Sequence, residues 1–542
     1  MTEARIKSLF AGDIYRRIEE VIKVDQADEA IIAQEIDEYI VTDAIRDHYR
    51  RILHDYWETK NKPHEGIAIW VSGFFGSGKS SFAKMLGLAL QNREIEGTGA
   101  ATRFGARADD KKMKVLLDQI SEHIPSDAVI FDVSTDRGIR SGNQTLTEIM
   151  YRLFLRRLGY ADDLDLAELE IALEQKGELA RFEEKYRELF SQEWNANKEL
   201  ISFSLGEASA VMHELFPDRY PTGESWAQAV QDRADVNPGK LAERCQELMA
   251  RRRPDKNLVF VIDEVGQFVA RDVQKMLDLQ AVVQSLGRVA RGKIWIVVTS
   301  QERLNELVGG LEDKRVELAR LMDRFPQQVH LEPSDISEVT SKRVQAKDAA
   351  AQKTLRDLYE AHSGRLHQNT KLTADITLPE LTAERFMDLS PLLPYQIDLI
   401  IQVVSGLRTQ GGASKHVGGA NRTIIKLAQQ LLVHEAVGLA EEPIGKLARI
   451  DQVYDLVAGN IASEIRGKIA DIEKQVEHPF AQPAAKAICL LQYVKSIHRT
   501  AENIAAALHP GVAADSVLPQ VKEALQKLVD AQKIRLSDGQ YR

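Results

Sequence analysis

Five short apolar runs stand out along the chain, and each ends in polar or glycine residues. Short runs rich in valine and isoleucine are typical of strands in a parallel sheet that is covered on both faces. Segments with helical periodicity separate the runs, so the pattern predicts a doubly wound α/β domain with a five-stranded parallel sheet. The expected strands are residues 67–71, 128–134, 258–262, 294–298 and 328–331.

The first run leads into a glycine-rich turn and then into a helical pattern at residues 82–90. The turn has the form G-x-x-x-x-G-K-S, in which backbone N–H groups and the next helix N-terminus face phosphate oxygens. Lys79 would reach the β- and γ-phosphates, and Ser80 would ligate Mg²⁺. We therefore expect a nucleoside triphosphate, ATP or GTP, to bind with Mg²⁺. The binding residues would be Gly73, Phe74, Phe75, Gly76, Ser77, Gly78, Lys79, Ser80 and Ser81.

The third run ends in two carboxylates, Asp263 and Glu264, at the sheet edge where ligands bind in α/β folds. Asp263 would hold Mg²⁺, directly or through water, and Glu264 would polarise the attacking water as general base. The fourth run ends in Thr299, Ser300 and Gln301. Any of these three could lie beside the γ-phosphate and hold the water, and the sequence does not choose among them.

Composition narrows the class of protein. The 542 residues are too many for one core, and 44% hydrophobic with 28% charged residues is an ordinary globular composition. No apolar run approaches the roughly 20 residues of a membrane helix, so we expect no membrane contact. Two cysteines without metal-ligand company, Cys245 and Cys489, fit a reducing cytoplasm. The net charge of −10 argues against non-specific coating of nucleic acid, although a local basic patch stays open.

The periodicity divides the chain into four parts. We expect an N-terminal helical segment (1–60), a P-loop domain (61–332) with a helical insertion at about 144–253, a helical lid (333–445), and a helical linker with a winged-helix domain (446–542). Residues 97–110, rich in glycine, threonine and arginine, are expected to form a loop. Residues 40–42, just upstream of the P-loop, either line the pocket for the base or belong to a helix that packs on the domain.

The C-terminal 58 residues, 485–542, read as three helices followed by a hairpin around Asp538-Gly539. The third helix occupies the place of a recognition helix and carries Lys522 and Lys527, diluted by Glu523 and Asp530. DNA contact and protein contact both stay open for it. Because the chain stops soon after the hairpin turn, we expect it to be the N-terminal portion of a longer protein.

The order of these landmarks resembles the AAA+ ATPases, and among them the origin-recognition and STAND-like branch. The resemblance implies that Arg324, or Arg320 one turn earlier, is a finger inserted into a neighbouring subunit's active site. The alternative is an arginine that caps its own helix C-terminus. Arg422, in a G-x-x-R opening a lid helix, resembles the second sensor that touches the γ-phosphate. The alternative there is an exposed arginine in a first turn.

A closer resemblance rests on residues 9–42 and on the extended P-loop segment at residues 69–84. Both resemble the P-loop proteins of bacterial BREX phage-defence systems (BrxC/PglY), whose known members are much longer. The resemblance implies a cytoplasmic ATPase that works with a DNA methyltransferase and other BREX proteins.

Three hypotheses follow for function. The chain is an AAA+-type ATPase that forms a homo-oligomer with ATP, a slow nucleotide-gated switch or scaffold, or a DNA-binding loader that uses the winged helix.

Overall fold

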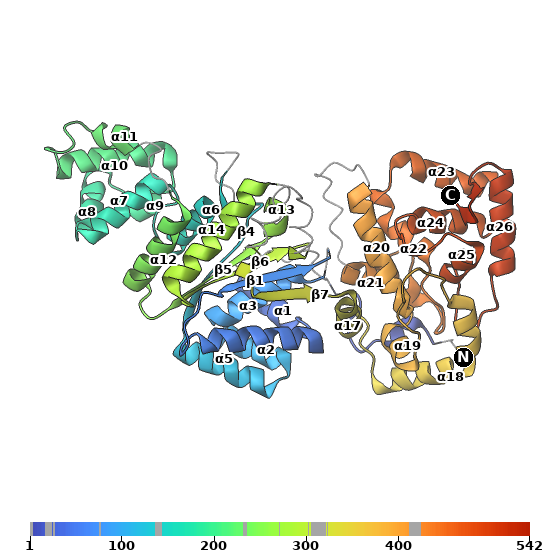
Figure 1. Cartoon of the computed structure of the whole chain (residues 1–542). Coiled ribbons are helices and arrows are strands. Elements are labelled where there is room, and N and C mark those ends of the chain that lie inside the picture. The colour runs from blue at the N-terminus through green and yellow to red at the C-terminus, as the bar shows by residue number, and fades with distance from the viewer. Residues whose placement is uncertain are drawn as a thin grey trace.

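A five-stranded parallel sheet forms the centre of the first of two bodies (Figure 1). The computed structural model describes residues 4–16, 24, 26, 28–74, 77–135, 144–230, 236–269, 272–301, 303–304, 321, 323–410 and 424–542. The strand order is β4-β5-β6-β1-β7, and every neighbouring pair is parallel. The strands are β1 (Ala68–Gly73), β4 (Ser126–Asp132), β5 (Asn257–Asp263), β6 (Ile294–Ser300) and β7 (Gln327–Leu331).

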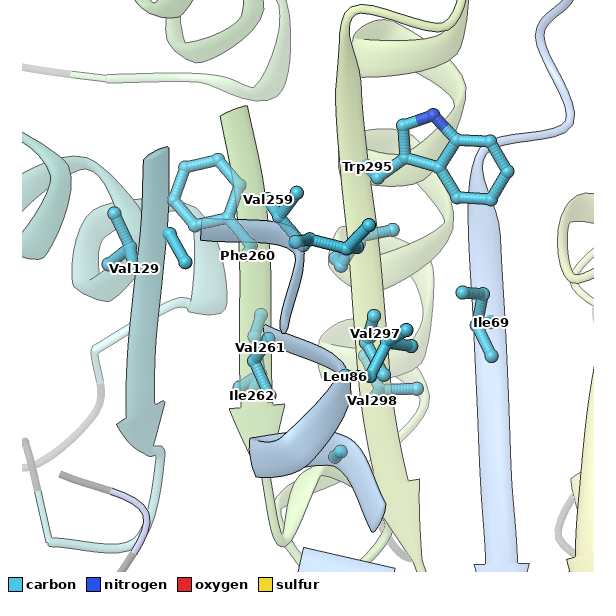
Figure 2. Close-up of a cluster of buried hydrophobic side chains, with 14 of the residues drawn as sticks. Ile69, Leu86, Val129, Val259, Phe260, Val261, Ile262, Trp295, Val297 and Val298 are labelled. Carbon is cyan, nitrogen blue, oxygen red and sulfur yellow. The ribbon is translucent and has the colours of Figure 1, made fainter. Parts of the chain in front are cut away.

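Helices cover both faces of this sheet, which is why the strands are apolar almost throughout. One face carries α1 (Glu29–Asp37), α2 (Asp43–Glu58), α3 (Lys79–Gln91), α4 (Ala100–Ala108) and α5 (Lys111–His123) (Figure 1). The other carries α6 (Leu146–Arg157), α12 (Pro238–Arg252) and α14 (Val273–Ala290), and the short α13 (Val265–Val269) follows β5. Figure 2 shows the alternating side chains of β5 that fill both layers of this core.

The predicted α/β class with a five-stranded parallel sheet is confirmed by this topology. The expectation of a loop over residues 97–110 is wrong. Strand β3 (Thr98–Gly99) pairs with β2 (Glu94–Ile95), and α4 follows at once. Ala100, Ala101, Phe104 and Ala108 recur on one face of α4 and are buried, so packing outweighs the turn-like composition.

Part of the insertion between β4 and β5 forms a separate helical unit at one end of the molecule (Figure 1). Its core gathers around two buried tryptophans, Trp194 and Trp226. The Trp194 indole donates a hydrogen bond of 2.7 Å to Glu170. The helices of the unit are α7 (Leu164–Gln175), α8 (Leu179–Phe190), α9 (Trp194–Asn197), α10 (Ile201–Leu215) and α11 (Ser225–Val230).

The second body is helical and encloses one continuous hydrophobic cluster. Ile6, Leu9 and Ile14 from the start of the chain belong to this cluster, and the segment Ile6–Leu9 contacts α18. No helix in the described ranges has the length and apolar character needed to span a bilayer. The elements are η1 (Ile6–Leu9), α17 (Pro333–Arg343), α18 (Ala349–Thr370), α19 (Ala383–Leu389), α20 (Pro394–Gln410), α21 (Ile424–Val433), η3 (Leu439–Glu441), α22 (Ile450–Val457), η4 (Ala458–Asn460) and α23 (Ser463–Gln475).

The C-terminal region packs into the same cluster. It consists of α24 (Ala481–Leu491), α25 (Ala501–Ala507), α26 (Leu518–Asp530) and the antiparallel pair β8 (Leu536–Ser537) and β9 (Gln540–Tyr541). Asp538 and Gly539 both have positive φ, as a type I′ hairpin turn requires. Three helices and a hairpin lie in the expected order, and the winged-helix assignment stays a prediction.

Close approach of α3 to the sheet gives a first prediction. A Cβ at Gly87 would lie 2.8 Å from Val261 Cγ2 and 3.0 Å from Ile130 Cδ1. We expect Gly87→Ala to destabilise the P-loop domain by about 1–3 kcal/mol through overpacking. A lower melting temperature in thermal unfolding would show this.

Gly206, on a helix with open space around its Cα, is the matched control. Gly206→Ala should leave the melting temperature equal or raise it, because alanine favours the helix. Equal effects of the two substitutions would contradict the close approach of α3.

Candidate functional site

The glycine-rich turn joins the carboxyl end of β1 to the first residue of α3. A Cβ at Gly73 would lie 2.5 Å from Ser77 Oγ and 3.1 Å from the carbonyl oxygen of Leu331, so the backbone there admits only glycine. Gly78 has φ of 91°, a left-handed conformation that glycine adopts without strain. The turn is thus shaped by the glycines that the motif requires.

Two side chains of the turn are buried within it. Lys79 is 5% exposed, and its Nζ donates a hydrogen bond of 3.2 Å to the carbonyl oxygen of Phe74. Ser77 Oγ is buried and has no hydrogen-bond partner in the part of the chain that the structure describes. A buried cation and a buried, unpartnered hydroxyl at a helix N-terminus fit a bound phosphate group. Phe75 and Gly76 lie outside the described residues, and Ser81 lies in the first turn of α3.

Asp263 and Glu264, at the end of β5, lie against the end of the neighbouring strand β6. The Thr299 hydroxyl donates a 2.5 Å hydrogen bond to Asp263 Oδ1 and accepts one of 3.0 Å from the backbone N–H of Glu264. Thr299 is fully buried, so a single hydroxyl fixes both consecutive residues of the carboxylate pair. Of the three polar residues that end β6, Thr299 thus has hydrogen bonds to both Asp263 and Glu264.

The backbone at Glu264 is unusual. Its φ of 58° is rare for a residue with a side chain, and such conformations persist where the surrounding structure imposes them. Two residues later, a Cβ at Gly266 would lie 2.0 Å from Ser300 Oγ. The chain therefore turns sharply after β5 and rests directly on the end of β6, which places Ser300 in a packing contact with α13.

Asp263 also meets the P-loop. Burial raises the pKa of its carboxyl, whereas hydrogen bonds from Thr299 and Ser80 lower it, and nearby Lys79 acts in the same direction. A carboxylate hydrogen-bonded to Ser80 offers the hard oxygen ligands that Mg²⁺ prefers, and Mg²⁺ typically takes only one or two protein ligands alongside phosphates and water. The residues fit the expected Mg²⁺ ligands, Ser80 and Asp263. Among the described residues, no cluster of three or more histidine, cysteine or acidic side chains forms a different metal site.

Asp132, at the end of β4, is a site residue that the sequence analysis missed. It pairs in register with Asp263, and its charge raises the pKa of the Asp263 carboxyl. Its carboxylate accepts hydrogen bonds of 2.7 Å and 2.6 Å from the backbone and hydroxyl of Ser134. The signal was a polar residue at the end of an apolar run, as at β5 and β6.

Arg324 lies at the amino ends of the strands, whereas the P-loop lies at their carboxyl ends. It is half-buried and precedes β7 by three residues, and its buried Nε has no hydrogen-bond partner among the described residues. Strand β7 pairs with β1, and Gln327, its first residue, is opposite Ile69 near the amino end of β1. The length of β1, at about 3.3 Å per residue, therefore separates Arg324 from the P-loop of its own chain. Arg320 and Arg422 lie outside the described residues.

Residues 40–42, considered for the base pocket, connect the first body to the second. Thr42 caps α2, and its hydroxyl donates a 2.9 Å hydrogen bond to Asp335 in α17. Nearby Glu38 accepts a 2.5 Å hydrogen bond from Arg343, also in α17. On the other side of the site, Phe74 of the P-loop packs against the hydrophobic cluster of the second body.

Comparison with known proteins adds little to this geometry. No protein-family model matches the chain. Among solved structures, the chain is similar to the crystal structure of Cdc6p from Pyrobaculum aerophilum, with 10% sequence identity, coverage of 98% of this chain and 93% of that chain, and a TM-score of 0.27. At this TM-score the likeness carries nothing about individual residues, whose roles rest on the contacts described above.

The double role of Thr299 gives the second prediction. Thr299→Val keeps the shape of the side chain but removes the hydrogen bonds to Asp263 and Glu264. We expect nucleotide binding, measured with a fluorescent ATP analogue, to be retained. Hydrolysis of ATP should fall by about 10- to 100-fold, as is typical when a group that orients a metal ligand is lost.

Thr340 is the matched control, because it is fully buried in α17 and its hydroxyl has no hydrogen-bond partner. Thr340→Val should leave hydrolysis unchanged. Hydrolysis at the original rate in Thr299→Val would show that Thr299 does not position the carboxylates.

Proposed function

We propose that this chain is an AAA+-type ATPase that binds Mg·ATP at the P-loop and hydrolyses it. The observation that carries the proposal is the meeting of Lys79, Ser80, Asp263, Glu264 and Thr299 at one edge of the sheet. Parallel strands bring these residues together from three separate parts of the sequence, as nucleotide sites in α/β sheets require.

Each residue has a chemical role in this proposal. Lys79 places its charge on the β- and γ-phosphates, and Ser80 and Asp263 would hold Mg²⁺, which neutralises charge on the transferring phosphoryl group when it is bound. Glu264 orients and deprotonates the attacking water, and Thr299 keeps Glu264 and Asp263 in place. Ser300 supports that arrangement through its contact with Gly266.

The contacts of the second body support a conformational role for the nucleotide. Phe74 joins the P-loop to the cluster of the second body, and α17 begins two residues after the end of β7. A change in the P-loop between the triphosphate and diphosphate states would therefore alter contacts with the second body. Arg422, in the expected second sensor, would strengthen this link.

Arg324 is proposed to act between subunits. Its position at the amino edge of the sheet excludes contact with the phosphates of its own chain, because an arginine side chain is far shorter than β1. The Arg324 guanidinium is only half-buried, and its exposed part would meet a neighbour's γ-phosphate. This favours a homo-oligomer in which active sites are shared.

The biological setting is proposed from the resemblance to the BREX P-loop proteins. In that setting the chain is a cytoplasmic bacterial protein of phage defence and acts on DNA together with other BREX proteins, including the DNA methyltransferase. Nucleotide-driven assembly or conformational change would be its contribution.

Two other functions stay open, and the contacts support them less well. In the DNA-loader hypothesis α26 binds DNA, but Lys522 forms an ion pair of 2.9 Å with Glu502, and Lys527 one of 3.0 Å with Glu523. These carboxylates would oppose a DNA phosphate. A nucleotide-gated switch would use the same P-loop without rapid turnover, and it would not need Arg324.

The third prediction separates binding from turnover. We expect Lys79→Ala to abolish binding of Mg·ATP, because it removes the buried cation of the P-loop. Glu264→Gln should bind Mg·ATP with the original affinity and lose hydrolysis by at least about 100-fold, since glutamine cannot take a proton from water. Binding by calorimetry and phosphate release measure the two effects. Full activity in Glu264→Gln would remove the assignment of the base.

The fourth prediction concerns assembly. Light scattering of the Glu264→Gln protein should show a multimer with Mg·ATP and a smaller species without it, because blocked turnover holds the ATP state. Adding Arg324→Ala to the Glu264→Gln protein should prevent the multimer. If the multimer still forms, Arg324→Ala alone should stop hydrolysis in the oligomer.

Arg356→Ala, at an exposed position on α18, is the control for loss of an arginine. An unchanged monomer under all conditions, with hydrolysis per subunit independent of protein concentration, would favour the switch.

A further inference from the structure

The helical unit between β4 and β5 carries the negative charge of the chain. Its residues 161–230 include 16 acidic and 6 basic side chains, so the unit has a net charge of −10, and the net charge of the whole chain is also −10. The rest of the chain therefore holds equal numbers of acids and bases. A charge excess confined to one small unit attracts a partner of opposite sign.

Acids on the side of the unit that faces the P-loop domain are matched by bases of that domain. Glu168 in α7 forms ion pairs with Lys240 (3.3 Å) and Arg244 (2.8 Å) of α12. Glu174, also in α7, pairs with Arg252 of α12 at 2.8 Å. This inner side is therefore close to electrical balance, and the excess of negative charge lies elsewhere on the unit.

The outer side of the unit, residues 179–215, consists of α8 and α10 with the segment between them, and it lies at the end of the molecule (Figure 1). It holds seven acidic and four basic residues. The four bases are each held in an ion pair with an acid of the same unit: Arg181, Lys185, Arg187 and Lys198. The acids outnumber the bases, so this side attracts cations.

The same outer side exposes three large apolar side chains. Phe203 is 68% exposed, Leu200 58% and Leu189 44%. The backbone N–H of Phe203 donates to the Leu200 carbonyl (2.9 Å), so these two lie in one turn at the start of α10. Tyr186 of α8 donates a 2.5 Å hydrogen bond to Glu207 of α10, and Leu189 and Phe203 each lie one helical turn from this contact. Exposed apolar side chains that gather among charged residues mark a surface for protein contact.

We propose that the outer side of the helical unit binds a basic amphipathic helix of another protein. The apolar face of that helix would cover Phe203, Leu200 and Leu189, and its lysine or arginine side chains would meet the surrounding acids. Two packed helices offer a third the ridges and grooves of a helical bundle. The acids would repel both nucleic acid and anionic lipid. A second copy of this chain is a poorer match, because outside the unit its acids and bases are equal in number.

The test uses the whole chain and a fluorescein-labelled peptide of about 15 residues, with leucine at helical spacing and lysine at the other positions. Binding is measured by fluorescence anisotropy. We expect saturable binding that Phe203→Ser weakens at least about tenfold, as is typical when an aromatic contact at an interface is lost. Val115→Ser is the matched control, because Val115 is an exposed apolar residue on α5, and it should leave binding unchanged.

Charge reversal tests the role of the acids. Glu188→Lys should weaken binding of the peptide at least about threefold. Its matched control is Glu464→Lys on α23, because Glu188 pairs with Lys185 and Glu464 pairs with Lys468 within their own helices. Both substitutions break such a pair and change the net charge equally, and Glu464→Lys should leave binding unchanged. The same peptide with glutamate in place of lysine should not bind.

Three results would overturn the proposal. The first is that the lysine peptide shows no saturable binding. The second is equal binding of a peptide of the same composition in which leucine and lysine strictly alternate, which would exclude a helical occupant. The third is a dimer, seen by light scattering without nucleotide, that Phe203→Ser dissociates, which would identify a second copy of the chain as the occupant.

Discussion

The in-register parallel pairing of β5, β6 and β1 is the constraint on which the candidate site depends. Val71 pairs with Thr299, Ser72 with Ser300, and Ile262 with Val298, so all three strands end at the same level. Burial on both faces holds this register, because a slip of one residue would exchange the side chains of the two faces. The hydrogen bonds that join Thr299 to Asp263 and Glu264 exist only in this register, and the strained turn at Glu264 is held by the same contacts.

Because the strands all run in the same direction, the two ends of the sheet carry different functional residues. The P-loop, the carboxylates and the connection to α17 all lie at the carboxyl edge, whereas Arg324 lies at the amino edge. In a subunit built in this way, Arg324 cannot reach the P-loop of its own chain. Contact between the amino edge of one copy and the carboxyl edge of the next would be heterologous, which generates rings or filaments. The same geometry makes the second body, joined at the carboxyl edge through Thr42–Asp335, a neighbour of the P-loop.

The sequence was sufficient for the parts of the fold that local pattern determines. The five apolar runs correspond to the five strands, and the P-loop lies between β1 and α3 because glycines and a helix start are local signals. Tertiary packing decided the rest. Residues 100–108 form a helix because alanine and phenylalanine on one face meet the core. Ile6, Leu9 and Ile14 join a cluster with residues hundreds of positions away, which periodicity alone does not reveal. Asp132 became visible only when the pairing of β4 with β5 was known.

The two edge strands of the sheet, β7 and β4, show how a fold protects backbone groups on the outer side of a sheet. An unpaired strand edge invites other strands, and proteins usually cover it or shorten it. At β7 the strand has five residues, and α2 contributes Arg51 to a carbonyl of the edge. At β4 the strand has seven residues, and Arg157 donates a 2.5 Å hydrogen bond to Asp127 on that strand. In the strand order, β5 and β6 lie between β4 and β1, so the edge at β4 is the one farther from the P-loop, and the edge at β7 is the one beside it.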